Sequence, residues 1–472
     1  MQTLIKNGTI ILGTESLHAD VKIEGEKVTQ IGKNLKVDPA VKVIDAAGLL
    51  VLPGGVDVHV HLDLPMFGTT SSDDHYTGTK AAAFGGTTTV IDFISQESDD
   101  LLDNVAKLRA KADKKAAIDY SFHANITHLS PEVEKAIPTL VGEGVTSIKV
   151  FTAYNDRLRL SDGEIFKVMR IAKKSGILTM LHAENGDVID ILVEEALAAG
   201  HLSPDWHSKT RPDWGAVEAV ARGSALSAIA DAPLYIVHMN AAGEVDQLEY
   251  AQKNGLKVYG ETCPQYLFFT ETDLQKTDGA KWVCSPPVRK EKDQKRLWEG
   301  LGSGVIQTIS TDHCPFFYDG SKPILYEGKE VAIPGKELGR GDFTKIPNGL
   351  PGVGDRMPVM WTEMVSSGRT TANEFVKLTC TNPARIFGMY PQKGTIQVGS
   401  DADIVIWDPN KNIHYGVAYS QQRTDYNLYE GWNLKGFPVT VISRGEVIVD
   451  RENWFGCPGR GKFIHRKRFQ ET

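Results

Sequence analysis

The sequence predicts an α/β protein in which a (β/α)8 barrel of the TIM type is joined to a β-sandwich formed by the N- and C-terminal segments. Eight short apolar runs alternate with helical segments through the middle of the chain, which is the pattern of such a barrel. Five of these runs carry a histidine, lysine or aspartate at or near their C-terminal ends. In parallel barrels that end is the catalytic one, so the same pattern predicts an enzyme.

The predicted barrel strands are 56–61, 87–93, 119–126, 147–154, 178–185, 234–240, 257–263 and 306–312. In the first strand His59 and His61 lie on one face and the intervening valines on the other, because successive strand side chains point to opposite faces. Helix signals separate the strands. Ser161 and Glu164 form a capping-box pattern that opens a helix ending near Gly176.

The ends of the chain are predicted to build the second domain. Residues 1–52 and 391–455 both consist of short strands and tight turns, and each set is too small to bury its own apolar faces. We therefore expect one β-sandwich made from both, with residues 53–390 as the barrel. Residues 456–472 form a basic tail that is expected to be solvated or to bridge subunits.

Composition narrows the class of partner. A net charge of -8 disfavours nucleic acid or an anionic membrane as the main partner. No apolar run is long enough to span a bilayer, and the chain opens directly on a strand-like segment, which argues against a membrane span or a cleaved signal. The five cysteines are scattered without paired spacing. Reduced thiols, and hence a cytoplasmic protein, are the expectation.

Side chains at the predicted strand ends have the chemistry of a metal centre. Imidazole and carboxylate ligands together suit zinc, or a related divalent ion such as manganese or cobalt. The alternative, buried core histidines, fits poorly because barrel interiors are filled by Val, Ile and Leu. The candidate ligands are His59, His61, Lys149, His182, His238 and Asp312.

Lys149 requires its own explanation, because an unmodified ammonium would be repelled by metal ions and is costly to bury. It lies in the apolar run 147–151. One solution is a Schiff-base lysine, which would leave the surrounding histidines without a role. The other is a carbamate formed with carbon dioxide, N6-carboxylysine, which bridges two cations as a carboxylate does. The ligand set favours the carbamate.

Several motifs resemble those of the cyclic amidohydrolases, and within them the dihydropyrimidinase/D-hydantoinase family. The resemblance spans nearly the whole chain. The matching motifs are Asp57-Val58-His59-Val60-His61, Ala82–Thr88, Lys149–Tyr154, His182-Ala183-Glu184-Asn185, Ser285-Pro286-Pro287, Asp312–Phe316, Ile346–Gly349, Lys393–Ile396 and Gly399–Asp403.

The resemblance implies a binuclear hydrolase. His59, His61 and Asp312 would hold one metal and His182 and His238 the other, with carboxylated Lys149 between them. Tyr154, Ser285 and Asn348 match the family's substrate contacts. Ser285 and Asn348 would hold the amide edges of the ring through their backbones, and Tyr154 would donate its hydroxyl to the oxyanion.

The implied reaction opens the cyclic amide of 5,6-dihydropyrimidines or 5-monosubstituted hydantoins to N-carbamoyl amino acids. A hydroxide bridging the metals would attack, with Asp312 as general base and then acid. Zinc is the expected metal, no organic cofactor is needed, and the family implies a homotetramer, with a homodimer as the alternative.

Other functions remain open at this point. Dihydroorotate is disfavoured, because Asp63 stands where an arginine would pair with its carboxylate. Allantoinase and a non-enzymatic dihydropyrimidinase-like scaffold are the alternatives, although all six ligand positions are intact. Leu64, Met66, Phe67 and segment 155–160 are candidates for an apolar side pocket, and the irregular segment 316–351 is expected to be a lid.

Overall fold

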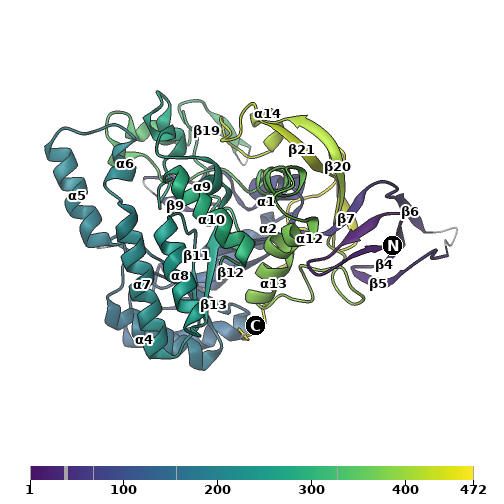
Figure 1. Cartoon of the computed structure of the whole chain (residues 1–472), viewed down its shortest axis with the longest axis horizontal. Coiled ribbons are helices and arrows are strands. Elements are labelled where there is room, and N and C mark those ends of the chain that lie inside the picture. Colours follow the sequence, from purple (N-terminus) through teal and green to yellow (C-terminus); the bar gives the residue numbers. More distant parts are fainter. Residues whose placement is uncertain (1, 37–40, 67, 156, 327, 471–472) are drawn as a thin grey trace.

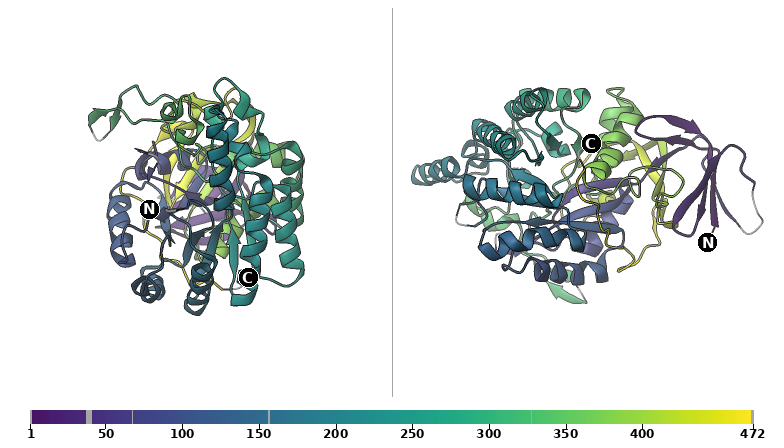
Figure 2. Two further views of the ribbon diagram at one scale, coloured as in Figure 1. Left: turned by 90° about the vertical axis from the view of Figure 1, so that its left-hand side faces the viewer. Right: turned by 90° about the horizontal axis from the view of Figure 1, so that it is seen from below.

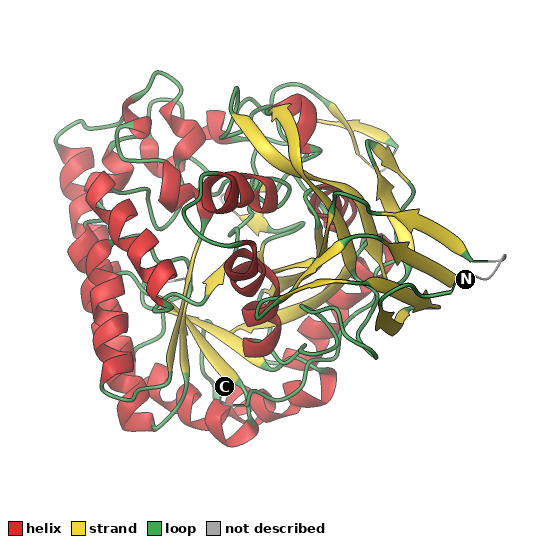
Figure 3. Ribbon diagram, turned by 45° about the vertical axis from the view of Figure 1, so that its right-hand side comes forward, coloured by secondary structure: helices red, strands yellow, loops and turns green. Residues whose placement is uncertain are grey.

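The computed structural model describes residues 2–36, 41–66, 68–155, 157–326 and 328–470. Its centre is a parallel eight-stranded barrel, surrounded by helices (Figures 1 and 3). The strand order follows the sequence, and a parallel bridge between Val60 and His313 joins the last strand's exit to the first strand. The barrel strands are β8 (Gly55–Val60), β11 (Thr87–Ile94), β12 (Asp119–Asn125), β13 (Ser147–Phe151), β14 (Leu178–His182), β15 (Leu234–Ile236), β16 (Val258–Thr262) and β17 (Thr308–Ile309).

All eight predicted strands are present in the predicted order, so the barrel is confirmed. Helices follow the strands as a (β/α)8 fold requires, and the Ser161–Glu164 capping box opens α4, which ends at Gly176. None of the helices in the described residues is long and apolar enough to cross a membrane. The helices are α1 (His75–Phe84), α2 (Leu101–Lys115), α3 (Pro131–Ala136), α4 (Asp162–Ser175), α5 (Gly186–Ala198), α6 (Trp206–Lys209), α7 (Asp213–Ala230), α8 (Ala242–Lys253), α9 (Pro264–Phe268), α10 (Glu291–Ser303), α11 (Arg356–Trp361), α12 (Ala372–Val376), α13 (Asn382–Ile386) and α14 (Val417–Ser420).

Two sheets beside the barrel form the β-sandwich, and both ends of the chain contribute to it (Figure 1). Strand β7 pairs antiparallel with β20 from far along the chain, through Ile404 and Pro53. An isoleucine- and valine-rich core that includes Ile5 and Ile442 fills the space between the sheets. The first sheet is β5 (Lys27–Gly32), β4 (Asp20–Glu24), β1 (Gln2–Lys6) and β6 (Lys42–Asp45), and the second is β23 (Asn453–Trp454), β22 (Glu446–Asp450), β21 (Asn433–Ser443), β20 (Ile404–His414), β7 (Leu50–Pro53), β2 (Thr9–Ile11) and β3 (Ser16–His18).

The C-terminal tail lies against the N-terminal side of the chain's own barrel. Phe463 bridges to Tyr120 near the start of β12, and the Ile464 N–H donates to the Tyr120 carbonyl. Further along, the Phe469 N–H donates to the carbonyl of Gly176, just before β14. The tail therefore covers the end of the barrel opposite to the one where the predicted ligands gather.

Segment 316–351 contains a small hairpin, β18 (Ile324–Tyr326) and β19 (Lys329–Val331), followed by the short turns η4 (Lys336–Gly339) and η5 (Phe343–Lys345). The hairpin extends away from the body of the protein (Figure 2). Pro334, which follows β19, is held near the barrel by a hydrogen bond from Thr69 Oγ1 to its carbonyl. In β18, the Tyr326 hydroxyl accepts a hydrogen bond from Lys115 Nζ of α2 at 3.2 Å. The segment is therefore tied to the body of the protein at Tyr326 and at Pro334.

Candidate active site

The C-terminal end of the barrel brings the six predicted ligands together. They come from the ends of five strands or from the residues that follow them. His59 lies in β8 and His61 directly after it, Lys149 lies in β13, His182 ends β14, and His238 and Asp312 follow β15 and β17.

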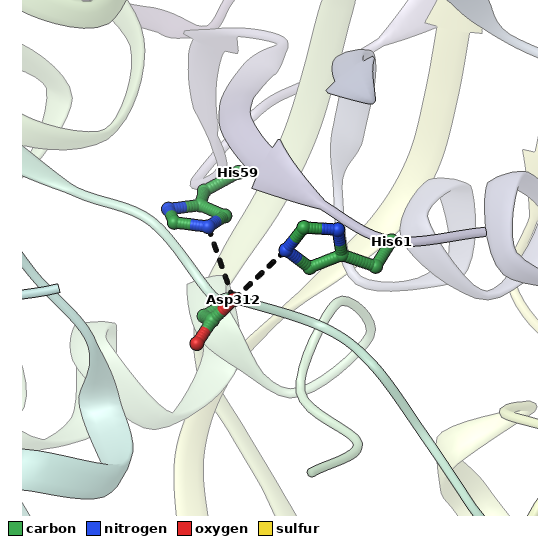
Figure 4. A group of neighbouring side chains, drawn as sticks. All are labelled: His59, His61 and Asp312. Atoms are coloured by element: carbon green, nitrogen blue, oxygen red, sulfur yellow. Dashed lines mark ion pairs between the residues drawn. The ribbon is translucent and has the colours of Figure 1, made fainter. Parts of the chain in front are cut away.

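His59, His61 and Asp312 form the first cluster (Figure 4). Asp312 Oδ1 lies 3.0 Å from His59 Nε2 and 3.3 Å from His61 Nε2. One ligand atom from each residue fits within 4.8 Å of the others, which is close enough for the three to share one cation. The side chains of His59 and His61 lie on the same face of the first strand, as the alternation of strand side chains requires.

The other three predicted ligands adjoin this cluster. His182 Nδ1 lies 2.9 Å from His238 Nε2, and the His238 ring is 5.4 Å from the ring of His59, centroid to centroid. Lys149 Nζ lies 3.1 Å from His59 Nε2. The histidine pair, the lysine and the first cluster therefore form one continuous group.

Three residues of this end have left-handed backbone conformations. The φ angles are 63° at Tyr154, 40° at His238 and 53° at Asp312. Such angles are uncommon for residues other than glycine and tend to occur at functional sites. They follow the ends of β13, β15 and β17, which stop before the predicted strand ends at 154, 240 and 312.

Two buried carboxylates orient the histidines, and the sequence interpretation did not single out either. Glu261 Oε1 lies 2.7 Å from His59 Nδ1, and Glu184 Oε2 lies 2.9 Å from His182 Nε2. A carboxylate on one ring nitrogen fixes which nitrogen faces a metal. The available signal was a glutamate inside the apolar strand 258–262, where a charge is costly unless paired.

The first strand is also tied to the segment that carries Asp312. Buried Asp57 accepts hydrogen bonds from Thr311 Oγ1 at 2.7 Å and from the Thr311 N–H at 3.2 Å. His59 and His61 are thereby held in place relative to Asp312, which follows β17, the last strand of the barrel.

The charges of the group suit a divalent cation. Burial opposes ionisation of Asp312, but the neighbouring His59 and His61 hold the pKa of its carboxyl well below the usual range. Burial lowers the pKa of His238 far below its usual value and also lowers that of Lys149. The neutral imidazole of His238 and the ionised carboxylate of Asp312 have the charge states of ligands of such an ion.

The three predicted substrate contacts lie together beside the ligands. Asn348 Nδ2 donates to Ser285 Oγ at 3.1 Å, and the Ser285 side chain is near enough to the Tyr154 hydroxyl to affect its pKa. The Tyr154 ring is 5.1 Å from that of His182, centroid to centroid. Burial raises the pKa of Tyr154, so the hydroxyl keeps its proton near neutral pH and can donate it in a hydrogen bond.

The expected side pocket is described only in part, because Phe67 and residue 156 lie outside the described residues. The rest of segment 155–160 is tied to helix α5 by polar contacts. Asn155 Nδ2 donates to Asp190 at 2.8 Å, and Arg159 pairs with Asp187. These contacts hold Asn155 and Arg159 against helix α5.

Comparisons with known proteins agree with this geometry. The amidohydrolase family matches residues 50–448. A D-hydantoinase of Geobacillus stearothermophilus is 43% identical over 99% of this chain and 97% of its own. The crystal structure of a dihydropyrimidinase from Brevibacillus agri superposes with a TM-score of 0.95 at 44% identity, covering 100% of both chains. An L-hydantoinase (dihydropyrimidinase) from Arthrobacter aurescens superposes with a TM-score of 0.87 at 28% identity, covering 98% of this chain and 99% of its own. The chain therefore belongs to the amidohydrolase family, in the group of D-hydantoinases and dihydropyrimidinases.

Proposed function

We propose that this protein hydrolyses the cyclic amide of 5,6-dihydropyrimidines or 5-monosubstituted hydantoins and releases N-carbamoyl amino acids. One observation carries the proposal: four histidines, Asp312 and Lys149 converge at the catalytic end of the barrel, directly beside Tyr154 and Ser285. The relatives named above act as D-hydantoinases or dihydropyrimidinases, which points to the same ring chemistry.

His59, His61 and Asp312 would hold one divalent cation, and His182 and His238 would hold a second. Lys149, carboxylated on its amine, would contribute to both. The lowered pKa of Lys149 favours the neutral amine, which is the form that reacts with carbon dioxide. When bound, divalent cations lower the pKa of water toward ~7 and polarise a carbonyl oxygen.

The protein's own groups provide the proton transfers. Asp312 is ionised at neutral pH and can accept a proton from the attacking water, then pass it to the departing ring nitrogen. Tyr154 stays protonated and can donate to the oxygen that becomes negative in the tetrahedral intermediate. The backbones of Ser285 and Asn348 would hold the amide edge of the ring.

Three finer assignments accompany this proposal. Zinc suits the His and carboxylate ligands best, with manganese or cobalt as substitutes. A homotetramer, with a homodimer as the alternative, is supported by exposed apolar side chains on α5 and α7, including Ile191 and Trp214. Four of the five cysteines are buried and all are free, which supports a cytoplasmic location.

The test is steady-state hydrolysis of dihydrouracil and of 5-substituted hydantoins by protein of assayed metal content, with Lys149→Ala as control. Preferred turnover of dihydrouracil that the control lacks would place the enzyme in dihydropyrimidine breakdown. Preference for bulky hydantoins would make it a hydantoinase. Fully metallated protein that opens neither ring would contradict the proposal, and allantoin would be tested next; protein that binds no metal would support the scaffold alternative.

A further inference from the structure

Lys336 is a buried lysine at the base of segment 316–351. It begins the short turn η4 and its exposed fraction is 1%. Its Nζ donates to two backbone carbonyls, that of Val283 at 2.9 Å and that of Pro347 at 3.0 Å. A buried amine is costly unless its donors are used, so these two hydrogen bonds explain how it is tolerated there.

The two carbonyls belong to the two segments that carry the expected ring contacts. Val283 lies two residues before Ser285, and Pro347 directly precedes Asn348. The Val283 carbonyl also accepts from the N–H of Gly349 at 3.1 Å. Lys336 therefore sits where the two segments meet and reaches both of them at once.

No carboxylate of the described residues pairs with the Lys336 amine. Burial lowers the pKa of Lys336 to about 7, and the titratable groups that act on it most are the thiols of Cys284 and Cys314. Burial raises the pKa of Cys284 to about 12, so that thiol stays neutral at physiological pH. The hydrogen bonds to the two carbonyls are thus the main interactions of the Lys336 head group.

The backbone around Lys336 is itself held in place. The Lys336 N–H donates to the Phe317 carbonyl at 2.7 Å. The next residue, Glu337, accepts from the N–H groups of Gly320 and Gly335, each at 2.9 Å. The backbone that carries the Lys336 amine is therefore fixed, although the β18–β19 hairpin of the same segment extends away from the body of the protein (Figure 2).

We propose that Lys336 is a positioning residue for recognition of the ring. By donating to both carbonyls, Lys336 sets the distance between the backbones of Ser285 and Asn348. That distance determines how well the two backbones fit the cyclic amide. The inference rests on the proposed function, because those two backbones are the expected ring contacts. Segment 316–351 thereby has a role at the site, because Lys336 at its base supports the backbone that is expected to bind the ring amide.

The test compares Lys336→Met, which keeps the length and removes the donors, with Lys336→Gln, which keeps a shorter donor. Lys329→Met, an exposed position on β19 of the same segment, is the matched control. We expect KM for the preferred ring to rise at least tenfold in Lys336→Met and less in Lys336→Gln. In both, kcat should stay within threefold of the parent and metal content should be unchanged, because binding common to ground and transition states is lost. The control should keep the parental KM within twofold.

A KM within twofold of the parent in folded Lys336→Met would overturn the inference, and so would a loss of kcat with loss of metal at unchanged KM. If Lys336→Met does not fold, Lys336→Gln decides: a KM raised at least threefold at unchanged kcat supports the inference, and a parental KM overturns it. Parent enzyme that opens neither ring would remove the proposed function and this inference together, whereas parental turnover with unaffected variants removes only the inference.

Discussion

Two clusters of charged residues contain a lysine. At the catalytic end of the barrel, Lys149 lies beside His59, His61 and Asp312. Where the barrel meets the sandwich, Lys393 is surrounded by Asp119, Asp401 and Asp403. Both groups have three ligand atoms close enough for a metal ion. Proximity of ligand atoms therefore does not by itself identify a metal centre, and the difference lies in how each group balances its charge.

At the junction the protein supplies its own cations. Lys393 Nζ lies 2.5 Å from both Asp119 and Asp403 and 3.0 Å from Asp401, and Arg444 adds a second positive charge at 2.8 Å from Asp119. Burial opposes protonation of Lys393, but the three carboxylates outweigh it and raise its pKa. The junction is thus a closed ion-pair network.

At the catalytic end the lysine responds in the opposite way. Burial dominates at Lys149 and lowers its pKa, and its amine nitrogen lies 3.1 Å from His59 Nε2. The positive charge of Lys149 is therefore disfavoured by its surroundings, whereas the junction aspartates stabilise the positive charge of Lys393. We therefore expect mutation of Lys149 to reduce activity and mutation of Lys393 to reduce stability.

Lys149→Met should have the largest effect on activity. We expect ring hydrolysis to fall by at least ~10³-fold, more than is typical for loss of one oxyanion donor, because the ligand that we propose to be shared by both cations is removed. The free energy of unfolding should not fall, since a buried amine is replaced by an apolar chain of similar length. Turnover assays and urea unfolding would check both, and substantial retained activity would contradict the assignment of Lys149.

Lys393→Met should show the reverse. Removing one partner from a buried ion network costs about 3–5 kcal/mol of unfolding free energy, because uncompensated charges stay buried. Metal content per folded chain should remain that of the parent. Urea unfolding and metal analysis test this, and unchanged stability would mean that the junction relaxes or takes up another cation.

Glu261→Gln sharpens the comparison within the catalytic end. Loss of the carboxylate that orients His59 should weaken metal binding by about 10–100-fold, measured by competition with a chelator. Asp119→Asn at the junction is the matched control, and it should alter stability without altering metal affinity. Equal effects of the two variants on metal affinity would remove the distinction between the groups.

The smallest expected effect is in alkaline solution. Because the folded-state pKa of Lys393 is raised, its stabilising contribution is complete below its ordinary value of about 10.5 and is lost as pH rises beyond it. The difference in unfolding free energy between the parent and Lys393→Met should therefore stay constant from pH 7 to about 10 and shrink above. A difference that shrinks below pH 9 would contradict the raised pKa.

The sequence predicted the barrel, because the barrel depends on local patterns, and the same patterns explain why the candidate ligands lie together. Alternation in strand 56–61 placed His59 and His61 on one face, and the run of strand ends placed the other ligands beside them. Lys336 could not be found in this way. It lies in an irregular segment, and its partners are backbone carbonyls distant in sequence, which leave no mark in side-chain chemistry.

Glu261 could be found only in part from the sequence. Its strand was predicted, and a glutamate in an apolar run is a visible anomaly, yet its partner His59 is far away in the chain. The strand ends at 154, 240 and 312 were placed too late. The strands end earlier, and the left-handed φ angles that follow at Tyr154, His238 and Asp312 depend on tertiary contacts that propensity does not contain.

The pairing of β7 with β20 affects how the chain folds during translation. Residues 50–53 leave the ribosome early, but their partner strand follows the entire barrel. At typical elongation rates the gap lasts roughly 20–70 s. The nascent barrel must therefore fold while one sheet edge beside it stays open, and contacts so distant in sequence form slowly. A stalled or truncated translation product would expose that edge to other chains, which makes it a natural target for chaperones.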